Sequence, residues 1–223
     1  MTAPDRWPAD VPPTGTSAWY VRSEALTFGR WRVRCHVDDR HPDGEVVADP
    51  GPLDETFLLW DADLDGQGRP VLSVNPAVAP GAPAMWFVHL DERDADPPAT
   101  ALVAFATDDL PAGTVVSDPV FFHMPVRSDE QVAAIRWWHD EAVVDQVYVA
   151  EPMRRRHVGT VAIYAASAFH QFHGWPGRLH SDGRRTVLGE ALVAGLRHPD
   201  RIAELGTLLS PMDPAATPPP TGD

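Results

Sequence analysis

The chain has 223 residues, which is enough to bury a hydrophobic core as one large domain or as two small ones. Its net charge of −14, with 32 acidic residues against 18 arginines and no lysine, disfavours binding to free nucleic acid or an anionic membrane and suits a cationic partner such as an amine. The sequence contains no apolar run of membrane-spanning length, no secretory signal pattern and only one cysteine, so we expect a cytoplasmic protein without an intramolecular disulfide.

Composition divides the chain into four regions. A proline-rich arm and a proline-rich tail lie at the two ends, where few apolar residues could support a packed core. Between them, a β-rich half precedes a half in which strands and helices alternate. The expected boundaries are residues 1–16 for the arm, 17–125 for the β-rich half, 126–210 for the mixed half and 211–223 for a disordered tail.

Short apolar runs bounded by turn residues predict the strands of the β-rich half. Residues 17–25 fit either a short helix or an edge strand. In residues 27–37, apolar side chains alternate with Arg30, Arg32 and Arg34, which predicts a strand whose arginine face pairs with neighbouring carboxylates rather than with a bound anion. Further strands are expected at residues 56–60, 70–74, 84–90, 100–107 and 114–124.

Two of these strands carry further signals. The run at residues 100–107 also fits a short helix, although the flanking turn residues favour a strand. Pro119 indicates an edge position or a bulge in the last strand.

Residues 61–66 match the first half of an EF-hand calcium loop. The twelfth position is Leu72 instead of the bidentate glutamate, so we expect an ordinary hairpin turn there and no calcium site.

The stretch at residues 143–172 organises the mixed half. Its first part is rich in β-branched residues and predicts a strand that ends before Pro152 and pairs with a preceding strand at residues 132–138. Its second part has apolar residues at steps of three and four from Val158 to Phe172, which predicts a helix. A short strand starting at residue 179 and helices at residues 186–196 and 199–209 are expected to follow.

The join between this strand and this helix has the composition of an anion site. Arg154, Arg155 and Arg156 precede the helix, and Gly159 lies near its start. A helix N-terminus presents unpaired N–H groups and the positive end of the helix dipole, and a glycine lets a ligand approach the backbone. The pattern favours a phosphate or pyrophosphate ligand.

The same join resembles the pyrophosphate loop of the GNAT-type N-acyltransferases, which reads Q/R-x-x-G-x-G/A. Arg154 and Gly159 match this pattern, whereas His157 stands in place of the first glycine. Residues 177–181 and 185–192 are similar to the next strand and helix of that family, so the resemblance covers residues 128–198. The family's first two helices and last two strands have no clear counterpart.

The resemblance implies an α/β (α+β) fold: a GNAT-like mixed sheet with C-terminal helices, preceded here by the β-rich half. It implies an enzyme that transfers an acetyl or acyl group from acetyl-CoA or another acyl-CoA to a small-molecule or peptide amine. Loop N–H groups and the arginine side chains would hold the phosphates, and the strand backbone would hold the pantetheine arm. The implied cofactor contacts are Val147, Val149, Arg154, Arg155, Arg156, His157, Val158, Gly159 and Thr160.

Transfer to an amine needs a group that removes a proton from the ammonium form. Asp145 is the first candidate base, because strand alternation predicts that it shares a face with Val147 and Val149. Glu141 and His139, in the turn before the strand, are the alternatives.

The leaving thiolate also needs a proton, and the tyrosine that usually supplies it in the family has no counterpart in residues 186–196. Ser181, His180 and Glu190 are candidates to replace it, or the thiolate leaves unassisted.

The remaining histidines and the cysteine are expected to be structural. No metal site is expected from His170 and His173, because no acidic cluster accompanies them. Cys35 is expected to be a buried structural thiol.

Two readings without catalysis stay open. One is a GNAT-like module that senses acyl-CoA or binds a protein, with its loop altered at His157. The other is a β-rich binding domain at residues 17–125. The sequence leaves the oligomeric state open, and a homo-oligomer is among the states that it allows.

Overall fold

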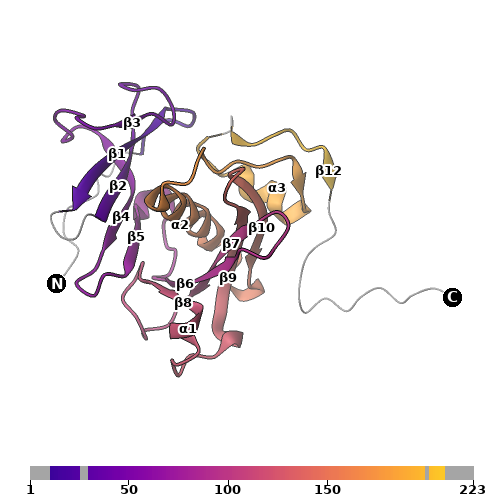
Figure 1. Ribbon diagram of the computed structural model, residues 1–223. Helices are drawn as coiled ribbons and strands as arrows, with labels where there is room; N and C mark the ends of the chain where they lie inside the picture. The colour runs from indigo at the N-terminus through magenta and orange to yellow at the C-terminus, as the bar shows by residue number, and fades with distance from the viewer. Residues whose placement is uncertain (1–10, 26–29, 199–200, 209–223) are drawn as a thin grey trace.

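The computed structural model describes residues 11–25, 30–198 and 201–208 (Figure 1). The first ten residues of the expected arm and the whole of the expected tail lie outside this part of the chain. The described residues form two five-stranded sheets, one two-stranded sheet and one long helix, so the fold is mixed α+β with few helices. None of the described helices is long and apolar enough to cross a membrane.

The first sheet comes from the β-rich half and has the strand order β3-β1-β2-β4-β5. β3 pairs with β1 in parallel, and all other neighbours are antiparallel. Residues 18–25 are thus a strand, which settles the open alternative there. The bounds are β1 Ala18–Ala25, β2 Arg30–Val37, β3 Val46–Val47, β4 Phe57–Leu64 and β5 Pro70–Val74.

The second sheet has the order β10-β9-β7-β6-β8, in which only β6 and β8 are parallel. The Leu72 N–H donates to the Gly113 carbonyl at 2.9 Å, which joins the edge of the first sheet to the loop before β8. The bounds are β6 Trp86–Glu92, β7 Ala99–Phe105, β8 Val115–Ser117, β9 Gln131–Trp138 and β10 Val143–Val149.

Helix α2 (Val158–His173) lies between the two sheets (Figure 1). It contacts β2, β4 and β5 of the first sheet and β7, β9 and β10 of the second. Buried side chains occur around most of its circumference, which is typical of a helix inside a core rather than on a surface. One hydrophobic cluster contains Val33, Leu59, Ile135 and Phe169, so the two halves of the chain share a core.

The remaining helices are short. Thr186 caps α3 (Val187–Val193), since its Oγ1 accepts a hydrogen bond from the Gly189 N–H at 3.0 Å. The others are α1 Asp118–Phe121 and the 3₁₀ turns η1 Pro76–Val78, η2 Ser128–Glu130 and η3 Glu151–Met153.

Three predictions of secondary structure were wrong. The turn expected at residues 61–66 begins only after Leu64, because β4 continues through residues 61–64 and pairs with β5 there. The strand expected at residues 114–124 ends at Ser117, and Pro119 lies in the first turn of α1, a position that does not need an N–H donor. The helix expected at residues 199–209 is absent from its described part. Ile202 instead forms a parallel bridge with Ser181, and β12 (Thr207–Leu208) pairs with β11 (Arg184–Arg185), because tertiary pairing outweighs the helical spacing of the leucines.

Candidate functional site

The candidate site lies where β10 meets the chain after α2. Residues 179–181 run parallel to β10 but touch it at one point, a bridge between Val143 and His180. There the Val144 N–H donates to the His180 carbonyl and the His180 N–H donates to the Ala142 carbonyl, each at 2.9 Å. A pocket of about 140 Å³ lies beside this bridge, and both segments line it.

Four parts of the chain form the walls of this pocket. Val144 and Val147 come from β10, and Ile163, Tyr164 and Ser167 come from the middle of α2. Leu59 and Trp60 of β4 also line it. Residues 179–186, α3 and the segment after α3 complete the wall, so the lining is mainly apolar with polar groups between.

Asp145 lines the pocket at a bulge in β10. Val144 pairs with Trp137 and Gln146 pairs with Arg136, so Asp145 is an extra residue between two registers. Its carboxylate accepts a hydrogen bond from Arg136, which belongs to the outer face of the sheet, whereas Val147 packs against the core. The shared face expected for Asp145 and Val147 was therefore wrong, because the bulge interrupts the alternation.

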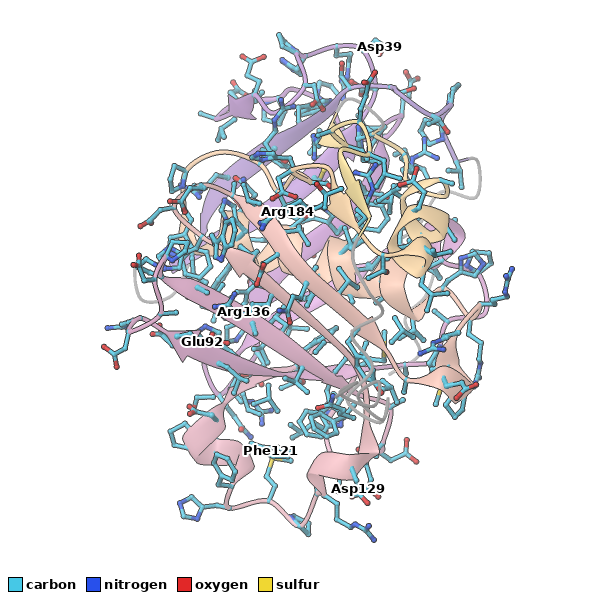
Figure 2. The ribbon with its side chains drawn as sticks, turned by 90° about the vertical axis from the view of Figure 1, so that its right-hand side faces the viewer. Asp39, Glu92, Phe121, Asp129, Arg136 and Arg184 are labelled. Atoms are coloured by element: carbon cyan, nitrogen blue, oxygen red, sulfur yellow. The ribbon has the colours of Figure 1, made fainter. Side chains whose placement is uncertain are left out.

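Arg136 ties Asp145 to a second carboxylate. Its Nε donates to Glu92 Oε2 at 2.9 Å, and Figure 2 shows Arg136 and Glu92 side by side on the sheet. The Asp145 side chain is 17% exposed and that of Arg136 is 24% exposed, so the pair is partly shielded from water. Asp145 thus has the right place for a base, but a guanidinium neutralises it.

The alternative bases do not line the pocket. His139 stacks on Trp175 with ring centroids 4.9 Å apart and contacts Asp140, with 2.8 Å between Nδ1 and Oδ1. Glu141 is exposed in the same turn.

Two of the three candidate acids do line the pocket, namely Ser181 and His180. The Ser181 Oγ accepts a hydrogen bond from Arg185 Nη1 at 3.0 Å, which leaves its own proton available to donate. Glu190 is engaged elsewhere, since it accepts from Arg185 Nε at 2.7 Å.

The predicted phosphate loop precedes α2 as expected. Arg155 and His157 have left-handed backbone angles, with φ of 60° and 56°. Such angles cost about 1–2 kcal/mol in a residue other than glycine and are concentrated at ligand sites. His157 is the N-cap and makes no side-chain capping bond, so no N-cap side chain occupies the N–H groups of the first turn. Arg155, Arg156 and His157 are exposed, while Arg154 is half-buried and its Nε donates to the Val149 carbonyl at 3.3 Å.

Leu192 of α3 separates this loop from the pocket. A Cβ on Gly159 would lie 3.1 Å from Leu192 Cδ1 and 3.4 Å from Val149 Cγ2. Leu192 also lines the pocket, and Val158, Gly159 and Thr160 are buried. A ligand that spans loop and pocket therefore requires this side chain to move.

The aspartates of the calcium-like segment are held by arginines. Asp61 is buried and accepts two hydrogen bonds from Arg32, at 2.9 and 2.6 Å, and Arg32 Nε lies 3.4 Å from Asp63. This pairing is the one predicted for the arginine face of residues 27–37. In the described residues, no three His, Cys, Asp or Glu side chains gather where they could hold a metal ion.

Two groups singled out from the sequence are buried in the core. His170 is fully buried, and its Nε2 lies 2.9 Å from the Pro176 carbonyl, while burial lowers its pKa to about 4. Burial raises the pKa of the Cys35 thiol to about 12, as expected for a structural cysteine.

Two further pocket residues, Tyr164 and Arg197, were not singled out from the sequence. Burial raises the pKa of Tyr164 to about 12, and its hydroxyl accepts a hydrogen bond from the Arg197 backbone N–H. No local pattern marks either residue, because only the packing of the segment after α3 against α2 brings them together.

Comparison with known proteins identifies no relative: no family model, no curated protein and no solved structure matches the chain.

Proposed function

We propose that the protein is a cytoplasmic acyl-CoA-dependent N-acyltransferase. In this proposal the open edge of β10 holds the pantetheine arm, the loop at residues 154–160 holds the phosphates, and an amine accepts the acyl group. The observation that carries the proposal is the pocket beside β10, between a strand edge and a parallel segment that touches it at one bridge.

The backbone of β10 supports the binding of an extended amide-containing arm. The Ala150 N–H donates to the Val132 carbonyl at 2.9 Å, so every second residue of β10 faces β9. Val147 and Val149 lie at the alternate positions, and their backbone groups face the open edge. An extended ligand can add to such an edge through main-chain hydrogen bonds.

The loop supports binding of the phosphate end. It places three arginines at the N-terminus of a sixteen-residue helix whose N-cap side chain makes no capping hydrogen bond. Guanidinium groups pair with phosphate oxygens in a forked geometry, and the helix dipole adds a favourable field. The loop follows the C-terminal end of β10, so the acyl end of the ligand would point toward Val144 and Asp145.

The chemistry would proceed by direct attack. The amine nitrogen forms a bond to the thioester carbonyl carbon, the bond from carbon to sulfur breaks, and the thiolate leaves. Asp145 would take the proton of the ammonium group, with Ser181 or His180 donating to the thiolate. Asp145 can act only if the amine displaces Arg136, which would then stay paired with Glu92.

A second candidate function is a binding module for acyl-CoA without catalysis. One observation favours it: Arg136 neutralises Asp145, the candidate base. The Leu192 side chain beside Gly159 has to move in either case. Both functions require affinity for CoA, whereas a β-rich binding domain does not.

Isothermal titration with acetyl-CoA and with CoA tests both candidates. We expect micromolar to millimolar binding, and release of free thiol with a panel of amines then separates enzyme from binding module. Absence of binding at millimolar CoA would refute both and leave the β-rich binding domain.

A further inference from the structure

The lining of the pocket beside β10 is rich in arginine although the chain as a whole is acidic. Among the described residues, four arginines line it: Arg184, Arg185, Arg197 and Arg201. Asp145 is the one acidic residue that the described part of the chain contributes to the lining, and Arg136 already pairs with it. Because the chain as a whole has a net charge of −14, an arginine in this lining that lacks a carboxylate partner would favour a ligand with negative charge.

Three of the four arginines have carboxylate partners that account for their charge. The pairs are Arg184 with Asp182 at 2.6 Å, Arg185 with Glu190 at 2.7 Å and Arg201 with Asp43 at 2.8 Å.

Arg197 differs from these three. Its Nη2 donates to the carbonyls of Pro12 and Pro13, the latter at 2.8 Å, but no carboxylate of the described chain lies within ion-pair distance of its guanidinium. Its Nε is buried without a hydrogen-bond partner. Burial lowers the pKa of Arg197, because removing a cation from water is costly unless an anion compensates for it.

The surroundings of Arg197 indicate which kind of anion fits. Tyr164 lies beside it, and since the Tyr164 hydroxyl accepts the Arg197 backbone N–H, its own proton can be donated to a ligand. Ile163, Leu179 and Leu196 form apolar walls around these polar groups. Apolar walls suit a ligand with an apolar body, and a guanidinium with a hydroxyl suits its carboxylate.

We propose that Arg197, assisted by Tyr164, anchors a carboxylate on an apolar ligand in the pocket beside β10. This inference stands on the pocket itself and does not require that CoA binds. If the proposed acyl transfer is correct, the carboxylate belongs either to the acyl group of the donor or to an amino acid that serves as acceptor.

Titration of the full chain with octanoate and with octanamide tests the anchor, because the two probes share an apolar body and differ in charge. We expect octanoate to bind at least tenfold more tightly than octanamide. Arg197→Gln should weaken octanoate binding about 10- to 100-fold, the usual effect of losing a hydrogen bond to a charged group, and Tyr164→Phe should weaken it several-fold. Arg93→Gln, at an exposed arginine that does not line the pocket, removes the same charge and should leave binding unchanged.

Three results would overturn the inference. Equal binding of the two probes by the wild-type protein, no octanoate binding at millimolar concentration, or unchanged binding by Arg197→Gln overturns the inference. If Arg197→Gln does not fold, the wild-type comparison and Tyr164→Phe decide instead.

Two further comparisons locate the carboxylate. Tighter binding of succinyl-CoA than of acetyl-CoA assigns it to the donor, and tighter binding of leucine than of isopentylamine assigns it to the acceptor. Octanoate binding that depends on Arg197, in a protein that binds no CoA ester, supports the inference while refuting the proposed acyltransferase.

Discussion

Gly159 provides the sharpest test of the phosphate loop, because its side-chain position is crowded by a neighbour that can move. A Cβ there would lie 3.1 and 3.3 Å from the two terminal carbons of Leu192 and 3.4 Å from Val149 Cγ2. Leu192 is half-buried on the short helix α3, so it can yield by a few tenths of an ångström.

Gly159→Ala should therefore change stability little. Alanine favours a helix over glycine by at most about 1 kcal/mol, and tight contacts with Leu192 offset part of that gain. The net change should stay within about 1 kcal/mol, which corresponds to a shift in melting temperature of no more than about 4 °C in a chain of this size.

CoA binding should respond differently. In the proposed complex Leu192 moves aside, and the added methyl group then fills the space through which a phosphate would approach the first turn of α2. The affinity for CoA should therefore fall at least about tenfold. Titration calorimetry and thermal melting of the same samples measure the two effects. Gly66→Ala is the matched control, since a Cβ there would meet nothing within 4 Å.

Unchanged CoA affinity in Gly159→Ala would refute the phosphate loop. A loss of stability above about 2 kcal/mol would show that the glycine serves the packing of Leu192 rather than a ligand.

Four other variants test two arginines of the loop, the candidate base and the buried His170. Arg154→Ala and Arg155→Ala should each weaken CoA binding by about 1–3 kcal/mol in calorimetry, and two unaffected variants would exclude these arginines as phosphate ligands. Asp145→Asn should reduce turnover on a confirmed amine about 10²- to 10⁴-fold with little change in CoA affinity, and full activity would assign the base elsewhere. Burial lowers the pKa of His170 to about 4. As pH falls below 6.5 the unfolded state binds a proton at this histidine before the folded state does. The contribution of neutral His170 to folding stability is therefore complete above pH 6.5 and is lost as pH falls toward 4. His170→Gln should flatten the fall in melting temperature over this range, and an unchanged slope would contradict the assignment.

The elements that the sequence predicts well are those with local causes. The strand expected at residues 132–138 agrees with β9 within one residue. The β-branched run after it forms β10, and the segment whose apolar residues recur every three or four positions forms α2. These patterns depend on neighbours along the chain. By contrast, the last expected helix is replaced by the pairing of β12 with β11, which depends on residues some twenty positions away.

The pocket could not be predicted because distant parts of the chain form it. Tyr164 and Arg197 come together through the packing of the segment after α3 onto α2. Leu59 belongs to β4, a strand of the first sheet. Neither an arginine near a histidine nor a tyrosine in an alanine-rich helix is unusual in a sequence. The role proposed for these two residues can be inferred only when the carboxylate partners of the neighbouring arginines are known.

The bulge at Asp145 shows how one inserted residue changes the chemistry that a strand can support. With regular alternation the carboxylate would point into the core beside Val147, where an unpaired charge would be strongly disfavoured. The bulge turns it toward Arg136 on the outer face and still leaves it at the edge of the pocket. A cationic amine can compete with the guanidinium for a carboxylate in that position. The pairing with Arg136 is therefore compatible with a base that is released only when an acceptor binds, and the effect of Asp145→Asn on turnover and on CoA affinity separates that role from a purely structural one.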